Sequence, residues 1–82
     1  MYYTYILRSK VDSQQLYVGH TTDLKRRLTE HNAGKSPHTA KFKPWSVVWC
    51  GCFESEKLAI AFEAYLKTAS GKAFLRKRLI SL

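Results

Sequence analysis

The chain has 82 residues, of which 45% are hydrophobic, and its 14 Lys and Arg against 6 Asp and Glu give a net charge of +8. This length fits one small domain spanning residues 1–82, and the apolar content excludes a disordered chain. The positive charge favours a polyanionic partner, above all nucleic acid. No apolar run approaches membrane-spanning length, and the amino terminus lacks the features of a signal peptide. We therefore expect a cytoplasmic protein with no membrane partner.

The two cysteines, Cys50 and Cys52, are too few for a disulfide framework. In a strand their side chains share a face, where they do not bridge without distortion. Their spacing from the histidines matches no common zinc pattern. We expect buried, reduced thiols.

The first half of the chain predicts a hairpin followed by a helix. Residues 2–7 and 16–19 are strand-like, and the polar residues 10–15 between them form a turn. The next segment has helical periodicity and predicts a helix over residues 22–32. Thr21 or Thr22 is expected to cap it, with Asp23 at the positive end of its dipole.

Asn32 and Gly34 supply the stop signal for this helix. The second half begins with a long connection over residues 33–44, of the kind that is often functional. A third strand is expected over residues 45–53.

A second helix, capped by Ser55, then follows and ends at Gly71. Its buried stripe is expected to consist of Leu58, Phe62, Tyr65, Leu66 and Ala69. Residues 72–82 predict a short final helix. The expected fold is α+β, with a small antiparallel three-stranded sheet flanked by helices in the order β-β-α-β-α-α.

Three tyrosines and a glycine are expected to gather on the hairpin. Tyr3 and Tyr5 alternate along the first strand and share a face, and Tyr17 lies near them once the hairpin closes. Gly19 lets another backbone or a phosphate approach closely, and the following helix offers free N–H groups to an anion. Strand tyrosines are more commonly packing residues with a solvated hydroxyl, which is the alternative interpretation here.

The three basic residues 25–27 are expected to have two different roles. Arg27 flanks the buried stripe of its helix, so it can turn toward the sheet beside Tyr17. Its planar guanidinium suits a phosphate, to which it can donate two hydrogen bonds. Lys25 and Arg26 point outward, toward solvent or a nucleic-acid backbone.

Glu63 lies in an otherwise apolar stretch of the second helix. One interpretation is an exposed pair with Lys67 at i, i+4, which contributes only a few tenths of a kcal/mol. The other is a carboxylate ligand for one Mg²⁺ or Mn²⁺ ion. His20 and His31 are equally open, since each is either a surface or a helix-end histidine. The residues alone favour the exposed pair.

Together these residues resemble the GIY-YIG nuclease family. Its two half-motifs appear as Tyr3-Thr4-Tyr5 and Tyr17-Val18-Gly19, with eleven residues between Tyr5 and Tyr17. Arg27 falls at the position of the family's arginine, and HNAG at residues 31–34 resembles its H-N-x-G. Glu63, within AFEAYLK, takes the place of the metal-binding glutamate. The string looks closest to small bacterial single-domain members related to the UvrC repair nuclease domain.

The resemblance implies a metal-dependent endonuclease that hydrolyses phosphodiester bonds in DNA. Glu63 would hold one Mg²⁺ or Mn²⁺, Arg27 would bind a phosphate oxygen, and Tyr17 with Tyr5 would orient or deprotonate the attacking water. His20 is the alternative base, and the two are not ranked. The residues expected to contact the nucleic acid are Lys25, Arg26, His31, Asn32, Lys35, Lys41, Lys43 and Lys67.

Two departures from the family pattern keep other functions open. Position 3 is tyrosine where the motif name has glycine, and the family's late asparagine would fall near Leu75, although no asparagine follows Asn32. Lys67 and Lys72 are the nearest replacements. The first alternative is a nucleic-acid-binding module that does not cut or that needs a protein partner to cut. The second is a basic protein that docks on an acidic protein.

Overall fold

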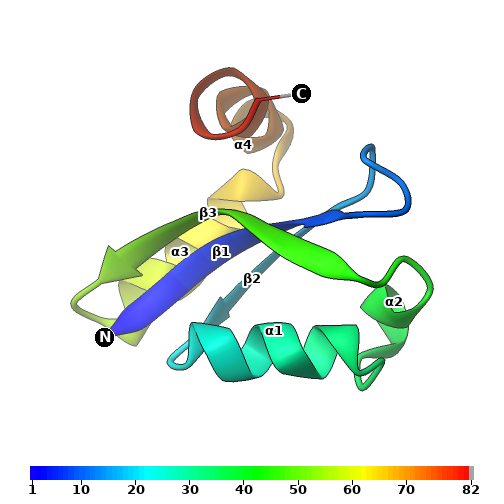
Figure 1. Ribbon diagram of the computed structural model, residues 1–82. Coiled ribbons are helices and arrows are strands. Elements are labelled where there is room, and N and C mark those ends of the chain that lie inside the picture. The colour runs from blue at the N-terminus through cyan, green and yellow to red at the C-terminus, as the bar shows by residue number, and fades with distance from the viewer. Residues whose placement is uncertain (82) are drawn as a thin grey trace.

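The computed structural model describes residues 1–81 of the chain. It consists of an antiparallel sheet with helices on both faces (Figure 1). The strands are β1 (Tyr2–Ser9), β2 (Leu16–Thr21) and β3 (Trp45–Phe53). The α-helices are α1 (Leu24–Asn32), α2 (Pro37–Ala40), α3 (Glu56–Leu66) and α4 (Ala69–Phe74), and a π-helix, η1, spans Leu75–Leu79. The expected α+β fold and its order are confirmed, with α2 added within the 33–44 connection.

The central strand β1 is buried on both of its faces. The sheet order is β2-β1-β3, with antiparallel pairing throughout. Tyr5 and Leu7 pack on the side of α1 together with Trp45, whereas Ile6 packs on the side of α3 with Leu66. Alternating side chains thus enter two separate core clusters. β2 is left as an edge strand, which places its residues at the rim of the molecule.

Helix α1 begins at Leu24, two residues later than the predicted start at residue 22. Asp23 is the N-cap, and its Oδ1 accepts a hydrogen bond from the Arg26 amide at 3.0 Å. Thr21 remains in β2, and its hydroxyl oxygen accepts a hydrogen bond from the Asp23 amide. At the other end, Gly34 has a φ of +78°, the left-handed conformation that stops a helix.

The carboxyl-terminal third departs most from expectation. α3 ends at Leu66, and a new cap at Thr68 accepts a hydrogen bond from the Gly71 amide at 3.0 Å. Gly71 is therefore inside α4 and does not end the preceding helix. A β-carbon at residue 71 would lie 1.7 Å from the carbonyl oxygen of Tyr65. This glycine permits α4 to pack directly on the end of α3.

The stripe expected to face the sheet is buried only in part, at Leu66 and at Phe62, which packs against the same cluster. Ala59 and Leu66 are fully buried, and the hydroxyl of Thr4 donates to the Ala59 carbonyl oxygen at 2.7 Å. Leu58 is 53% exposed and Tyr65 39% exposed. The small side chain of Ala59 allows the close approach of α3 to β1, and the larger side chains of Leu58 and Tyr65 lie on the flank of the helix.

The prediction of buried thiols was wrong. Cys50 and Cys52 are both free and exposed. Among residues 1–81, no helix has the length and apolarity required to cross a membrane.

Candidate active site at the edge of the sheet

Gly19 makes room for the ring of Tyr5. The two residues are directly opposite each other in β1 and β2. A β-carbon at residue 19 would lie 2.6 Å from the Tyr5 hydroxyl oxygen and 3.0 Å from the Tyr17 ring. The close approach expected at this glycine is therefore made by a side chain of the protein itself, which crosses β2 toward its edge.

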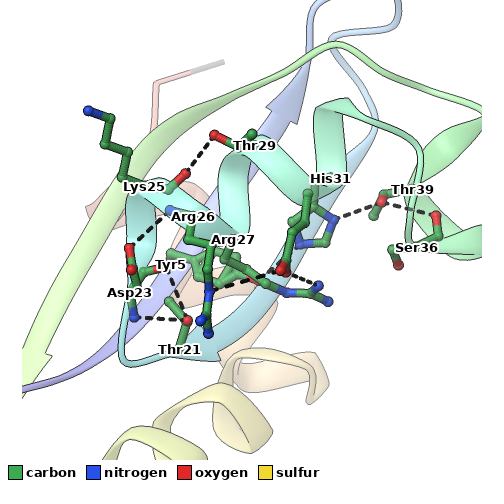
Figure 2. Close-up of polar contacts among 11 residues, drawn as sticks. Tyr5, Thr21, Asp23, Lys25, Arg26, Arg27, Thr29, His31, Ser36 and Thr39 are labelled. Atoms are coloured by element: carbon green, nitrogen blue, oxygen red, sulfur yellow. Dashed lines mark hydrogen bonds and ion pairs between the residues drawn. The ribbon is translucent and has the colours of Figure 1, made fainter.

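A buried hydrogen-bond chain holds the Tyr5 hydroxyl (Figure 2). Tyr5 Oη lies 3.0 Å from His31 Nε2, and His31 Nδ1 lies 2.7 Å from the Thr39 hydroxyl. A neutral imidazole has one N–H and one bare nitrogen, so His31 donates to one of these two hydroxyls and accepts from the other. The Thr39 hydroxyl oxygen also lies 3.4 Å from the Ser36 carbonyl oxygen.

Burial keeps both members of the Tyr5–His31 pair neutral. It raises the pKa of Tyr5 to about 12, against the opposing effect of the Arg27 guanidinium. Burial also lowers the pKa of His31 below its usual value, and the Arg27 charge adds to this effect. At neutral pH Tyr5 is consequently a neutral phenol that is hydrogen-bonded to a neutral imidazole.

Tyr17 and Arg27 border this pair on the same side of the sheet. The Tyr17 ring centroid lies 4.8 Å from that of His31 and 6.3 Å from that of Tyr5. Arg27 comes from α1, and its Nη1 donates to Glu30 Oε1 at 3.1 Å. Although partial burial opposes the charge of the guanidinium, Glu30 and the tyrosines raise the pKa of Arg27. A permanent cation therefore stands beside the tyrosines, with 32% of its side chain exposed.

Glu63 lies on the opposite side of the sheet, beneath the same edge strand. Its Oε1 is bonded to His20 Nδ1 from β2, and its Oε2 accepts from Lys67 Nζ at 2.7 Å. Burial alone would raise the pKa of Glu63, but the hydrogen bonds from Lys67 and His20 outweigh it and lower the pKa. The carboxylate is ionised, and only 18% of the Glu63 side chain is exposed.

The two halves of the site meet around the edge of β2. Tyr17 and His20 differ by an odd number of residues, so their side chains point to opposite faces of the strand. The charge of Glu63 nevertheless contributes to raising the pKa of Tyr5 across the strand. A phosphate lying along this edge would face Arg27 on one side and Glu63 on the other.

Glu63 has the chemistry of a ligand for a hard divalent cation. Residues 1–81 contain no group of three or more His, Cys, Asp or Glu side chains that would form a complete cage. Mg²⁺ is commonly bound by one or two carboxylates, with water and substrate phosphate completing its shell. The Lys67 ammonium on Oε2 shows that a cation fits against this carboxylate. The donor set thus fits a single ion shared with a phosphate.

The residues expected to grip nucleic acid divide into two groups. Those with exposed side chains are Lys25, Arg26, Lys35, Lys41, Lys43 and Lys67. His31 is fully buried, with both ring nitrogens bonded within the protein. Asn32 accepts from the Trp45 amide at 2.6 Å and donates to its carbonyl at 3.1 Å, which joins α1 to β3. The side chains of His31 and Asn32 are hydrogen-bonded within the protein and support the site. The structure therefore does not place them as contacts to nucleic acid, as the sequence predicted.

Two supporting residues escaped the sequence analysis. Glu30 follows Arg27 at i+3, a helical spacing that was available as a signal. Thr39 is fully buried, its hydroxyl is hydrogen-bonded to His31, and its carbonyl oxygen accepts from Trp45 Nε1 at 2.8 Å. It lies in an irregular connection, where no periodicity indicates which residue turns inward.

The fold and this arrangement of residues define the class of protein. The family model for the GIY-YIG catalytic domain matches residues 1–78, and the chain belongs to this family. Within it, the chain is similar to UPF0213 proteins of Streptococcus pyogenes. It is 42% identical to that of serotype M3 (strain ATCC BAA-595 / MGAS315) over 66 residues, which are 79% of this chain and 70% of the relative. The relative in serotype M5 (strain Manfredo) is 39% identical over the same shares.

A solved structure supports the same assignment. The solution NMR structure of the UPF0213 protein BH0048 from Bacillus halodurans matches with a TM-score of 0.53 and 33% sequence identity. The match covers 92% of this chain and 82% of that one. The resemblance to the GIY-YIG family and the expected fold are therefore confirmed.

Proposed function

We propose that the protein is a metal-dependent endonuclease that hydrolyses phosphodiester bonds in DNA. The observation that carries this proposal is that one edge strand, β2, has Tyr17 beside Tyr5 on one face and His20 bonded to Glu63 on the other. The family to which the chain belongs supports the reaction class. The net charge of +8 supports a polyanionic substrate.

Arg27 binds the phosphate in this proposal. Its guanidinium donates to a non-bridging oxygen, where negative charge increases in the transition state. The pairing with Glu30 holds the Arg27 side chain in place at one nitrogen, Tyr5 takes a second N–H, and the remaining N–H groups can bind the substrate. Glu63 would hold one divalent ion, Mg²⁺ or Mn²⁺, which supplies Lewis-acid stabilisation of the phosphate and the leaving oxygen.

The tyrosines have separate tasks. Tyr5, with a pKa of about 12, stays protonated and is committed to His31, so it positions its neighbours and does not take a proton from water. Tyr17 orients the attacking water beside Arg27. His20 is bonded to Glu63 through Nδ1, which holds the carboxylate in place, and the Nε2 of its exposed ring would accept the proton from water.

Cleavage of plasmid and branched DNA in Mg²⁺ or Mn²⁺ tests the proposal. We expect the wild type to cut, and Arg27→Ala and Glu63→Ala to lose at least about a hundredfold in rate, the usual effect of removing a group that stabilises the transition state. Equal cleavage by all three proteins would refute the catalytic assignment.

One observation favours a second candidate, a module that binds nucleic acid without cutting it. Leu75, near the position of the family's late asparagine, is buried in the core with Ile6 and Leu66. No polar group from residue 75 is available to the phosphate. DNA binding that weakens steeply with salt, without cleavage in any divalent metal, would favour this candidate.

A further inference from the structure

A cavity of about 340 Å³ adjoins the candidate active site and has no part in the function proposed above. It lies between the β1–β2 turn, the outer part of β2, and the segment from the end of α3 to η1. Its volume falls at the lower end of the range for small-molecule sites. The question is which ligand its lining would recognise.

One wall of the cavity is strongly basic. Lys67, Lys72 and Arg76 come from the end of α3, from α4 and from η1, and all three line the cavity. No Asp or Glu belongs to its lining within the described part of the chain. Three cations on one wall select an anion, and Arg76 suits a phosphate in particular.

The floor of the cavity is apolar. Leu66 and Leu75 are almost fully buried beneath it, and Leu16 and Val18 of β2 complete it. Gln14 and Gln15 also line the cavity, and a glutamine amide offers both donors and an acceptor. An inorganic phosphate would leave the apolar floor unused. A nucleotide has a flat apolar base with a polar edge, and a phosphate beside it, which matches all three features.

Lys67 places this cavity next to the reaction. It lines the cavity, and its Nζ donates to Glu63 Oε2 at 2.7 Å. Leu16 and Val18 line the cavity from β2, and the ring of Tyr17 between them points to the other face of the strand, against His31. We propose that the cavity binds one unpaired nucleotide of a DNA strand, next to the phosphate that is cut. A base stacked and paired in a duplex cannot enter it, so the substrate has a single-stranded or branched segment at this point. Cleavage next to the bound nucleotide rests on the proposed function, whereas binding of the nucleotide does not.

The cavity offers a matched pair of variants. Arg76 and Arg78 are both exposed residues of η1, but only Arg76 lines the cavity. The test measures the affinity of a dye-labelled pentathymidylate by fluorescence anisotropy, with EDTA present so that no cleavage occurs. We expect Arg76→Glu to weaken binding at least about tenfold and Arg78→Glu by less than about threefold, because a charged hydrogen bond is lost only in the first. Equal effects of the two variants, or no effect of Arg76→Glu, would overturn the proposal.

Methyl NMR locates the bound ligand and distinguishes a free nucleotide from a nucleotide within a DNA strand. In the wild type we expect thymidine 5′-monophosphate, the pentamer or both to shift the methyl signals of Val18, Leu66 and Leu75. Shifts with the monophosphate define a site for the nucleotide unit itself, and shifts with the pentamer alone define one that requires a strand. Shifts with neither would overturn the proposal. Methyl spectra of both variants that match the spectrum of the wild type establish that the variants are folded.

Failure of this inference is distinguishable from failure of the proposed function. Cleavage by the wild type together with unchanged binding by Arg76→Glu would refute the nucleotide cavity alone. Binding in the cavity without cleavage in any divalent metal would refute the nuclease and support the nucleotide site.

Discussion

The hydroxyl oxygen of Tyr5 lies 2.6 Å from the place that a β-carbon of residue 19 would occupy. Real β-carbons do not tolerate such a contact. The Tyr5 ring is 1% exposed and its hydroxyl is bonded to His31, so it has little freedom to withdraw. The glycine of the second half-motif and the tyrosine of the first are thus one steric unit, joined across the β1–β2 pair.

Gly19→Ala should destabilise the protein by about 1–3 kcal/mol, the usual cost of overpacking a well-filled site. Urea unfolding measures this loss. In the double variant with Tyr5→Phe the loss should be smaller than the sum of the two single losses, because the closest contact is gone. Strict additivity would show that the two residues do not collide.

Tyr5→Phe should remove one late step from the alkaline titration of the protein. The difference in phenolate absorbance between wild type and variant should have its midpoint near pH 12, because burial raises the Tyr5 pKa to about 12. Since the folded pKa exceeds the unfolded value of about 10, the stability from this group is present below pH 10 and is lost as the pH rises toward 12. A difference centred near pH 10 would contradict the buried phenol.

His31 should make folding sensitive to mild acid. Its folded pKa is lowered, so below pH of about 6.5 the unfolded chain binds the proton more readily. The free energy of unfolding should be unaffected by this group above that pH and fall as the pH drops through the folded pKa. Urea titrations between about pH 7.5 and 5 measure how the free energy of unfolding changes with pH. Glu63 does not contribute in this pH range, because its pKa is lowered.

The matched control for this slope is a second histidine. His31→Gln should flatten the dependence on pH, whereas His38→Gln should leave it unchanged, because His38 is exposed. Identical slopes in wild type and His31→Gln would exclude a buried neutral imidazole.

Gly71→Ala should destabilise the protein more than Gly19→Ala. The added carbon would lie 1.7 Å from the Tyr65 carbonyl oxygen, which is backbone and cannot rotate away. We expect α4 to separate from α3, with a loss of about 3 kcal/mol or more in unfolding free energy. Ser70→Ala, one residue earlier and exposed, is the control and should change it by less than about 0.5 kcal/mol. A stable Gly71→Ala protein would show that the helices do not pack this closely.

Local patterns in the sequence were sufficient for most of the fold. The hairpin, the third strand and the first two long helices follow from alternation, from helical spacing and from the Ser55 cap, whose side chain accepts from the Leu58 amide. Asp23 displaced the two threonines as a cap because Thr21 is held in β2 by pairing with Tyr3. Gly71 resembles a stop signal, but its role is a long-range contact that no local pattern reveals.

The candidate site was predicted as a set of residues but not as a geometry. The positions of Tyr5, Tyr17, Arg27 and Glu63 came from a motif, and their distribution over two faces of one edge strand depends on the sheet order. The burial of His31 was within reach, since it continues the stripe of Leu24 and Leu28 at i+7. Glu63 follows Ala59 at i+4 on the inward face of α3. This face was hard to predict, because the apolar residues Leu58 and Tyr65 lie on the exposed flank of the helix.

The single-turnover rate of DNA cleavage by Glu63→Gln tests the central claim most directly. This variant keeps the size of the side chain but removes the negative charge that would hold the metal, and Glu56→Gln, an exposed residue of the same helix, is its control. We expect Glu63→Gln to cleave at least about a hundredfold more slowly in saturating Mn²⁺ and Glu56→Gln to match the wild type. Cleavage by Glu63→Gln at the wild-type rate would contradict a nuclease site built on this carboxylate.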